Sequence, residues 1–348
     1  MNSIKIGTST IGVNEPCFII AEAGINHNGD IRLAKRLVDH AAEAGADAVK
    51  FQTFTPENVV TSSAGLVPYQ KKGAQVKKTQ VDLLKRVTLT DTEFISLKTY
   101  CDQKKIIFLS TPHSFDAIDF LEKLVPAYKF GSGDVTNIPA LTYAAKKGKP
   151  MILGTGMSTL DEVKCAVTAI QSEGNNRIVA LHCTTNYPCP LHGVNLQAMV
   201  TMKEELDCLI GYSDHTAGIL VPALAVALGA CVIEKHLTLD KSLPGPDHTA
   251  SLEPQELAEM IREIRNVEKV LGSREKKPTA SEKSMMEFVR KSIVAERDIA
   301  KGTVLTKEML AIKRPGTGMA PELLQTIIGK RTVKSIAKDE VIQPEMIA

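Results

Sequence analysis

The sequence predicts an α/β protein in which a (β/α)8 TIM barrel is followed by a small, β-rich C-terminal domain. Eight short apolar or β-branched runs alternate with helical patterns over the first three quarters of the 348 residues, as expected for parallel strands joined by helical crossovers. A charged stretch that contains Gly272 and Pro278 then has the composition of a linker. Beyond it lie only short β-like runs, separated by glycine-containing turns.

The eight predicted strands recur at intervals that leave room for a helix between neighbours. Helical spacing is clearest in Ile31–Ala44, where Leu37 and Ala41 fall on one face. Leu160–Ser172 and Gln255–Leu271 show the same pattern. A doubly wound sheet is the competing fold, but the turn after the first strand lacks its usual GxGxxG pattern. In chain order the predicted strands are Phe18–Ala23, Ala48–Phe54, Ile106–Thr111, Tyr128–Ser132, Met151–Thr155, Ile178–Thr184, Leu209–Asp214 and Val232–Leu237.

Composition changes predict three segments: a barrel domain at residues 1–272, a linker at 273–284 and a β-rich domain at 285–348. Within the barrel, Thr55–Arg86 is a long basic segment, which is either a lid over the barrel mouth or a solvated charged face. The predicted β-runs of the last domain are Ser292–Ala295, Thr303–Leu305, Leu310–Lys313, Thr332–Ser335 and Val341–Ile342.

The overall composition excludes several classes of function. A net charge of +2 and an aromatic content of 4% without tryptophan argue against a nucleic-acid-binding protein. The longest run free of polar side chains, Ala217–Ile233, contains Pro222 and is too short to span a membrane. Seven cysteines at irregular spacing indicate a reducing compartment rather than a disulfide framework. We therefore expect a cytoplasmic protein.

Lysines and hydroxyl groups occur at several predicted strand ends. In a parallel barrel the carboxyl ends of the strands form the active site. Lys50 and Lys129, with Thr111 and Ser132, offer the donors that a phosphate or carboxylate ligand needs. The alternative is that the two lysines form structural ion pairs with nearby carboxylates, namely Glu22, Glu234 or Asp134.

Two histidines, His215 and His236, end the last two predicted strands. Histidines on neighbouring strands suit a divalent metal ion, although each could also be a hydrogen-bonded structural histidine. A third, His182, lies within a strand, where we expect a hydrogen bond in the core. Glu22 and Asp134 are the carboxylates available for proton transfer at the same strand ends.

Nine segments along the barrel carry motifs of one known enzyme family. They are residues 18–29, 49–53, 110–112, 129–134, 154–157, 182–188, 212–215, 234–236 and 245–248. These motifs resemble, in order, those of the N-acetylneuraminate (sialic acid) synthase family, which includes legionaminate synthases. The tail Lys313–Gly316 resembles the C-terminal antifreeze-like (β-clip) domain of that family, so the resemblance spans nearly the whole chain.

The resemblance implies a reaction. Members of this family condense phosphoenolpyruvate with an N-acetylated mannosamine in its open aldehyde form. Water enters, phosphate leaves by cleavage of its bond to carbon, and a nine-carbon 2-keto acid results. The resemblance also implies a divalent metal, typically Mn2+ with Mg2+ or Co2+ as alternatives, held by His215 and His236.

Further roles are implied for individual residues. By resemblance, Glu22, Tyr187 and Asp247 contact the sugar. Arg314 matches an arginine that the antifreeze-like domain of one protomer inserts into the barrel of its partner in a homodimer. Departures from the family pattern are Asp134, where many members have Glu, Gly154, where Ser is common, and Gly73, where some carry Asn. Lys50, Thr111, Lys129 and Ser132 match positions that bind phosphoenolpyruvate.

Three alternatives remain open from the sequence. An aldolase that forms a Schiff base through Lys129 or Lys50 would need a lysine of low pKa and no metal. Ice binding by the C-terminal domain would need a regular threonine array, which residues 280–348 lack. The third keeps the chemistry and replaces N-acetylmannosamine with a 2,4-diacetamido-6-deoxy sugar, giving legionaminate.

Overall fold

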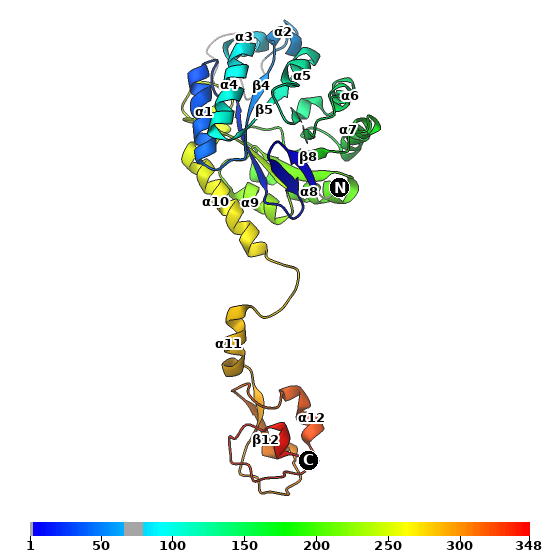
Figure 1. Ribbon diagram of the computed structural model, residues 1–348, viewed down its shortest axis with the longest axis vertical. Coiled ribbons are helices and arrows are strands. Elements are labelled where there is room, and N and C mark those ends of the chain that lie inside the picture. Colours follow the sequence, from blue (N-terminus) through cyan, green and yellow to red (C-terminus); the bar gives the residue numbers. More distant parts are fainter. Residues whose placement is uncertain (1–2, 66–78) are drawn as a thin grey trace. The chain divides into compact units, whose positions relative to one another are not determined.

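The computed structural model describes residues 3–65 and 79–348. The chain divides into two compact units, Met1–Gly272 and Ser273–Ala348, and each is described by itself. The first unit is the predicted barrel, drawn from blue to yellow in Figure 1. Eight parallel strands form one sheet in the order β5-β4-β3-β10-β9-β8-β7-β6. Because β5 and β6 also lie side by side, the sheet is a nearly closed barrel.

All eight predicted strands are confirmed, with ends that shift by at most two residues. The largest change is at β6, where Gly131 and the 3-10 turn Ser132–Asp134 replace the last predicted strand residues. The strands are β3 (Phe18–Gly24), β4 (Ala48–Thr53), β5 (Ile107–Pro112), β6 (Tyr128–Phe130), β7 (Met151–Gly154), β8 (Ile178–Cys183), β9 (Leu209–Asp214) and β10 (Val232–His236).

Helices follow each strand and cover the barrel. Several begin at Thr in a capping box, in which the Thr side chain and a carboxylate three residues on satisfy free N–H groups; Thr90 and Thr159 are examples. The predicted face of the first helix is confirmed, since Leu37 and Ala41 are fully buried. The helices of this layer are α1 (Ile31–Glu43), α4 (Asp91–Lys104), α5 (Phe115–Leu121), α6 (Ile138–Lys146), α7 (Leu160–Ser172), α8 (Leu196–Glu205), α9 (Leu220–Ala227) and α10 (Pro254–Leu271).

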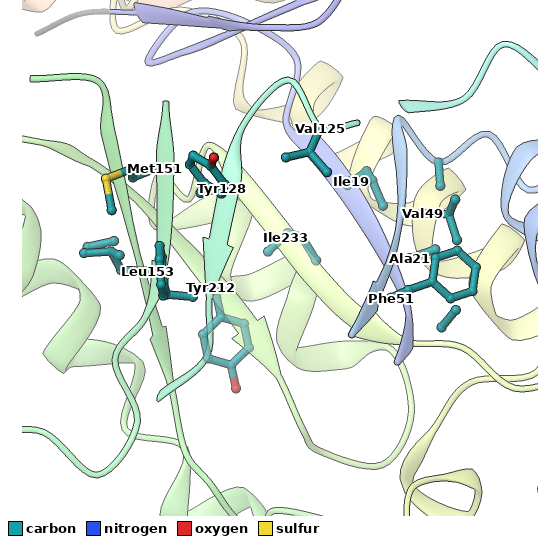
Figure 2. Close-up of a cluster of buried hydrophobic side chains, with 14 of the residues drawn as sticks. Ile19, Ala21, Val49, Phe51, Val125, Tyr128, Met151, Leu153, Tyr212 and Ile233 are labelled. Atoms are coloured by element: carbon teal, nitrogen blue, oxygen red, sulfur yellow. The ribbon is translucent and has the colours of Figure 1, made fainter. Parts of the chain in front are cut away.

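Side chains alternate between the two faces of each strand. Outward residues pack against the helices and form the larger core, of which Figure 2 shows Ile19, Val49 and Ile233 among others. Inward residues such as Ile20 and Val232 fill the barrel itself. The barrel is therefore a packed core below its mouth rather than a pore.

An N-terminal hairpin, β1 (Ser3–Ile6) with β2 (Ser9–Gly12), is absent from the sequence prediction. Its apolar side chains Ile4, Ile6 and Ile11 join the inward cluster of the barrel. The hairpin thus extends the interior core at the amino ends of the strands, opposite to the end where barrel active sites form. Runs of four residues carry too little periodicity to be recognised as strands.

The long basic segment after β4 is described only in part. It contains α2 (Pro56–Val59) and α3 (Gln80–Arg86). Its four lysines at positions 71, 72, 77 and 78, like Gly73, lie outside the described residues. The predicted lid therefore stays a prediction.

The second unit contains two α-helices, the second of them short, and a small β structure. Helix α11 (Ala280–Val289) is capped by Thr279, so the last five residues given to the linker are helical. Strands β11 (Ser292–Ala295) and β12 (Leu310–Lys313) pair antiparallel, as predicted. The other predicted runs contribute single β-bridges, and α12 (Leu324–Ile327) closes a separate apolar core. Among the described residues, no helix is both long and apolar enough to cross a bilayer.

Candidate active site

A buried ionic cluster lies at the carboxyl ends of the barrel strands. It consists of Glu22 on β3, Lys50 on β4, Lys129 on β6 and Glu234 on β10, none more than 4% exposed. Lys50 Nζ lies 2.6 Å from Glu22 Oε2 and 3.7 Å from Glu234 Oε2. Lys129 Nζ lies 3.2 Å from Glu234 Oε1. Both lysines thus form the ion pairs considered from the sequence, with Glu22 and Glu234 as partners.

Burial and neighbouring charges shift the pKa values of Glu22, Glu234 and Lys50. Burial raises the pKa of Glu22 to about 7, against the opposing effect of Lys50. Burial acts in the same direction on Glu234, but Lys129 and Lys50 outweigh it and hold the pKa at about 2. Burial would lower the pKa of Lys50, but Glu22 and Glu234 raise it above its usual value. Glu22 is therefore the member of this cluster that changes charge near neutral pH.

The predicted anion-binding residues are brought together around this cluster. Lys50 donates a hydrogen bond of 3.1 Å to Thr111 Oγ1. A β-carbon at Gly154 would lie 3.3 Å from Ser132 Oγ and 3.6 Å from Lys129 Nζ. Gly154 therefore leaves space between a lysine and a hydroxyl group, where an anion can find both a charge and a donor.

His215 and His236 lie together at the same mouth, since their ring centroids are 5.5 Å apart. The Tyr187 ring contacts both, at centroid distances of 4.2 and 5.6 Å. His215 Nδ1 lies 2.7 Å from the Thr184 carbonyl oxygen. Because a carbonyl only accepts, Nδ1 carries the proton and Nε2 is left with a free lone pair.

The histidine pair fits a divalent metal ion. Burial lowers the pKa of both imidazoles, so they are neutral and able to ligate. His236 Nδ1 is buried without a hydrogen-bond partner. Within the described ranges, no group of three or more His, Cys, Asp or Glu has metal-binding geometry. Water or substrate would therefore have to complete the coordination of an ion held by these two side chains.

The loop between β10 and α10 carries Asp247. Asn26 Nδ2 donates to both the Leu237 carbonyl and Ser251 Oγ, each at 2.9 Å. Ser251 Oγ in turn donates to the Asp247 carbonyl at 2.7 Å. The loop after β3 therefore holds the loop after β10, and Asp247 has a fixed backbone position beside the strand that ends in His236.

Asp247 allows a first prediction. Burial raises the pKa of its carboxyl to about 6 from 3.8. The folded state then binds this proton more tightly than the unfolded chain, so the stabilisation is complete below pH ~4 and is lost as pH rises through 6. Asp247→Asn removes the ionisation and should add about 3 kcal/mol to the free energy of unfolding at pH 8. Urea unfolding of both proteins should give equal stabilities at pH 4, and a difference that does not grow with pH would contradict this.

Asp134 and Arg314, two further predicted site residues, lie outside the barrel strands. Asp134 accepts a hydrogen bond from Asn137 Nδ2 at 3.2 Å. It lines a cavity of about 440 Å³ that Phe115 and His113 also border. Arg314 follows β12 in the second unit. Its predicted entry into a partner's barrel stays a prediction.

Glu234 and Cys183 also lie at the barrel mouth, but neither was predicted from the sequence as a site residue. Glu234 appears in the sequence analysis only as an ion-pair partner, yet it touches both lysines. Its place two residues before His236 puts both side chains on one strand face, a signal that could have marked it. Cys183 Sγ, 3.1 Å from Ser132 Oγ, carries no such signal. The expected core hydrogen bond of His182 is confirmed, to the Val194 carbonyl at 2.8 Å.

Comparison with known proteins shows which families this chain matches. The NeuB family is matched over residues 37–276 and the SAF domain over residues 290–348. The chain is 47% identical to an N,N'-diacetyllegionaminic acid synthase of Legionella pneumophila, over 93% of each protein. It is 39% identical to human N-acetylneuraminate-9-phosphate synthase, over 97% of this chain and 94% of that protein.

A solved structure has a similar fold over most of this chain. The crystal structure of the N-acetylneuraminic acid synthetase of Leptospira borgpetersenii, in complex with citrate, has a TM-score of 0.74 and 38% identity. The match covers 82% of this chain and 95% of that one. The two family models match the barrel and the small C-terminal domain, and the chain therefore belongs to the NeuB family of sialic acid synthase-like enzymes.

Proposed function

We propose that this enzyme condenses phosphoenolpyruvate with an N-acetylated mannosamine-type sugar and water, giving a nine-carbon 2-keto acid and phosphate. The observation that carries the proposal is the placement of Lys50 and Lys129 at the barrel mouth with Thr111 and Ser132 around the space beside Gly154. Two buried ammonium groups with nearby hydroxyls suit a substrate that carries a phosphate and a carboxylate. The family supplies the reaction type.

The charge balance of the cluster favours such an anion. Lys50 and Lys129 are neutralised by Glu22 and Glu234 when both carboxyls are ionised. Because the pKa of Glu22 is about 7, an incoming anion shifts Glu22 toward its protonated form, which leaves one positive charge uncompensated. Glu22 then holds a proton at Oε1 or Oε2 beside the reacting groups, where it can act as a general acid.

The bonds of the proposed reaction balance. Carbon 3 of phosphoenolpyruvate bonds to the sugar aldehyde carbon, whose oxygen takes a proton. The oxygen of water adds to carbon 2 and becomes the keto oxygen as the bond from that carbon to the bridging oxygen breaks; one proton of water replaces the proton given to the aldehyde oxygen, and the other leaves with phosphate. Lys129 and Ser132 are the groups that would stabilise the departing phosphate. Glu22 is the nearest carboxyl to Lys50 for proton transfer to the aldehyde oxygen.

His215 and His236 would hold the divalent ion, for which we propose Mn2+. When bound, the ion supplies Lewis-acid polarisation of the aldehyde oxygen. The chain's own contribution is to keep both imidazoles neutral by burial and to orient His215 through the Thr184 carbonyl.

Metal dependence follows as a prediction. Exhaustive chelation should abolish phosphate release, and added Mn2+ should restore it. His215→Ala should weaken Mn2+ binding in titration calorimetry, because one imidazole leaves too few protein ligands for a stable site. Full activity in a preparation that elemental analysis shows to be metal-free would refute the proposed metal site.

The sugar has two candidates. The identity of 47% to a diacetyllegionaminic acid synthase, against 39% to the human synthase, favours a 2,4-diacetamido-2,4,6-trideoxymannose, which would give legionaminate. N-acetylmannosamine, which would give N-acetylneuraminate, is the second candidate, favoured by the fit to the Leptospira structure. Phosphate release with each sugar at equal concentration decides between them by kcat/KM. No release with either sugar would refute the proposed reaction.

The Schiff-base alternative is disfavoured by the raised pKa of Lys50. Such an enzyme needs a lysine of low pKa, whereas Glu22 and Glu234 raise the pKa of Lys50. Borohydride with pyruvate should therefore leave Lys50 unmodified. We further propose that the enzyme is a cytoplasmic homodimer in which Arg314 of one protomer completes the site of the other.

A further inference from the structure

A second buried ion pair lies directly behind the histidines. Asp214 is the last residue of β9 and Lys235 the penultimate residue of β10. They are Cα partners in the parallel ladder, so they face each other across the two strands. Each is followed at once by a histidine, His215 or His236. Alternation along the strands points the ion pair toward the helix layer and the histidines toward the barrel mouth.

Every polar atom of this pair is engaged by neighbours. Both side chains are fully buried, and Lys235 Nζ donates to Asp214 Oδ2 and to the Thr216 carbonyl. Asp214 Oδ1 accepts from Tyr212 OH at 3.1 Å and from the Thr216 amide at 3.0 Å. Asp214 Oδ2 also accepts from Thr216 Oγ1 at 3.0 Å. The contacts therefore reach across His215, from the residue before it to the residue after it.

Stability alone gives little reason for such a pair. Desolvation of two ions offsets most of their attraction, and well-packed apolar residues of similar size often stabilise a fold at least as well. What a satisfied buried pair adds is a single defined arrangement. Here that arrangement fixes the register of β9 against β10 and the backbone on both sides of His215.

We propose that Asp214 and Lys235 are positioning residues that hold His215 and His236 in the relative placement needed for a two-histidine metal site. The inference rests on the metal site proposed above. It assigns the ion pair the role that outer-shell partners have in other metal sites, where their loss weakens metal binding while the ligands themselves remain.

The test variant removes both charges together. Asp214→Leu with Lys235→Met leaves no unpaired charge but removes the acceptor of Tyr212 OH and Thr216, so the melting temperature should fall by less than in either single variant. The dissociation constant for Mn2+ should nevertheless increase at least about tenfold. Calorimetric affinity for phosphoenolpyruvate without metal should not change, because Lys50 and Lys129 are untouched. The control is Leu141→Ala, a core truncation in α6 that lowers stability and should leave Mn2+ affinity unchanged.

A metal-free readout separates this inference from the metal proposal. With 15N-labelled histidine, the wild type should show a slowly exchanging His215 Nδ1 proton, bonded to the Thr184 carbonyl. The charge-free double variant should lose this signal, and Leu141→Ala should keep it. Should the double variant fail to fold, Thr216→Val removes one donor to Asp214 and should weaken Mn2+ binding in the same direction.

The results distinguish a failure of the proposed metal site from a failure of the positioning role. A wild type that binds no Mn2+ refutes the metal site, and the His215 signal then still decides whether the pair positions the imidazole. A wild type that binds Mn2+, with a folded double variant that binds it equally well and keeps the His215 signal, overturns the inference. If only Thr216→Val can be measured, unchanged Mn2+ affinity and an unchanged His215 signal overturn it equally.

Discussion

Lys50→Met is expected to slow phosphate release about 100- to 1000-fold, as the loss of one preorganised charge at a reacting anion does. It should also lower the free energy of unfolding by about 3–5 kcal/mol, because it leaves buried carboxylates with one cation fewer. The loss of stability should be largest at alkaline pH. Glu22, whose pKa is already raised to about 7, is protonated at lower pH and then needs no partner.

Two further variants separate the effect on chemistry from the effect on stability. Glu22→Gln with Lys50→Met removes the unpaired carboxylate, so it should recover most of the stability and none of the activity. Lys147→Met is the matched control, since this lysine pairs with Asp119 and Glu122 on the outer helices. It should change activity less than twofold. Near-normal phosphate release by Lys50→Met would remove this lysine from the proposed site.

Mixing two inactive variants is expected to restore activity if the C-terminal unit of one protomer completes the barrel of the other. Arg314→Ala removes the guanidinium, which offers a planar set of donors suited to a carbonyl or carboxylate. Lys129→Ala removes the barrel lysine that pairs with Glu234 and that we propose binds phosphoenolpyruvate. After subunit exchange, a mixed dimer has one site with both residues intact. At equal concentrations about half of the dimers are mixed, so about a quarter of wild-type activity should return.

The controls for this experiment concern exchange and dosage. Each variant alone should stay below about a hundredth of wild-type activity, and exchange should be shown by mass-tagged subunits. Mixing Lys129→Ala with Lys50→Met should give no recovery, because both lesions then lie in barrels. Proven exchange without recovery would mean that Arg314 acts within its own chain or not at all.

The barrel could be predicted from the sequence because its strands are buried on both faces. Runs such as Phe18–Ala23 and Ile178–Thr184 are almost continuously apolar or β-branched, and the helices between them have a clear apolar face. The N-terminal hairpin could not be predicted in this way. Its strands of four residues gain their stability from packing against the barrel interior, which local periodicity does not report.

The sequence was enough to predict which residues lie at the candidate site, but not which of them contact each other. Strand-end position was enough to single out Lys50, Lys129, His215 and His236. It could not show that Glu234 touches both lysines. Nor could it show that Asp134 turns to Asn137 instead, because the strand end becomes a 3-10 turn. Such partners depend on side-chain direction and on distances across the barrel, which sequence spacing does not contain.

The central claim is that this barrel joins phosphoenolpyruvate to an acylated mannosamine-type sugar with cleavage of the carbon–oxygen bond. The most direct measurement uses phosphoenolpyruvate labelled with 18O at the bridging oxygen, with the released phosphate analysed by mass spectrometry. We expect every phosphate to carry the label, one 2-keto acid to form for each phosphate, and neither to appear without the sugar. Unlabelled phosphate, or phosphate release that does not need the sugar, would contradict it.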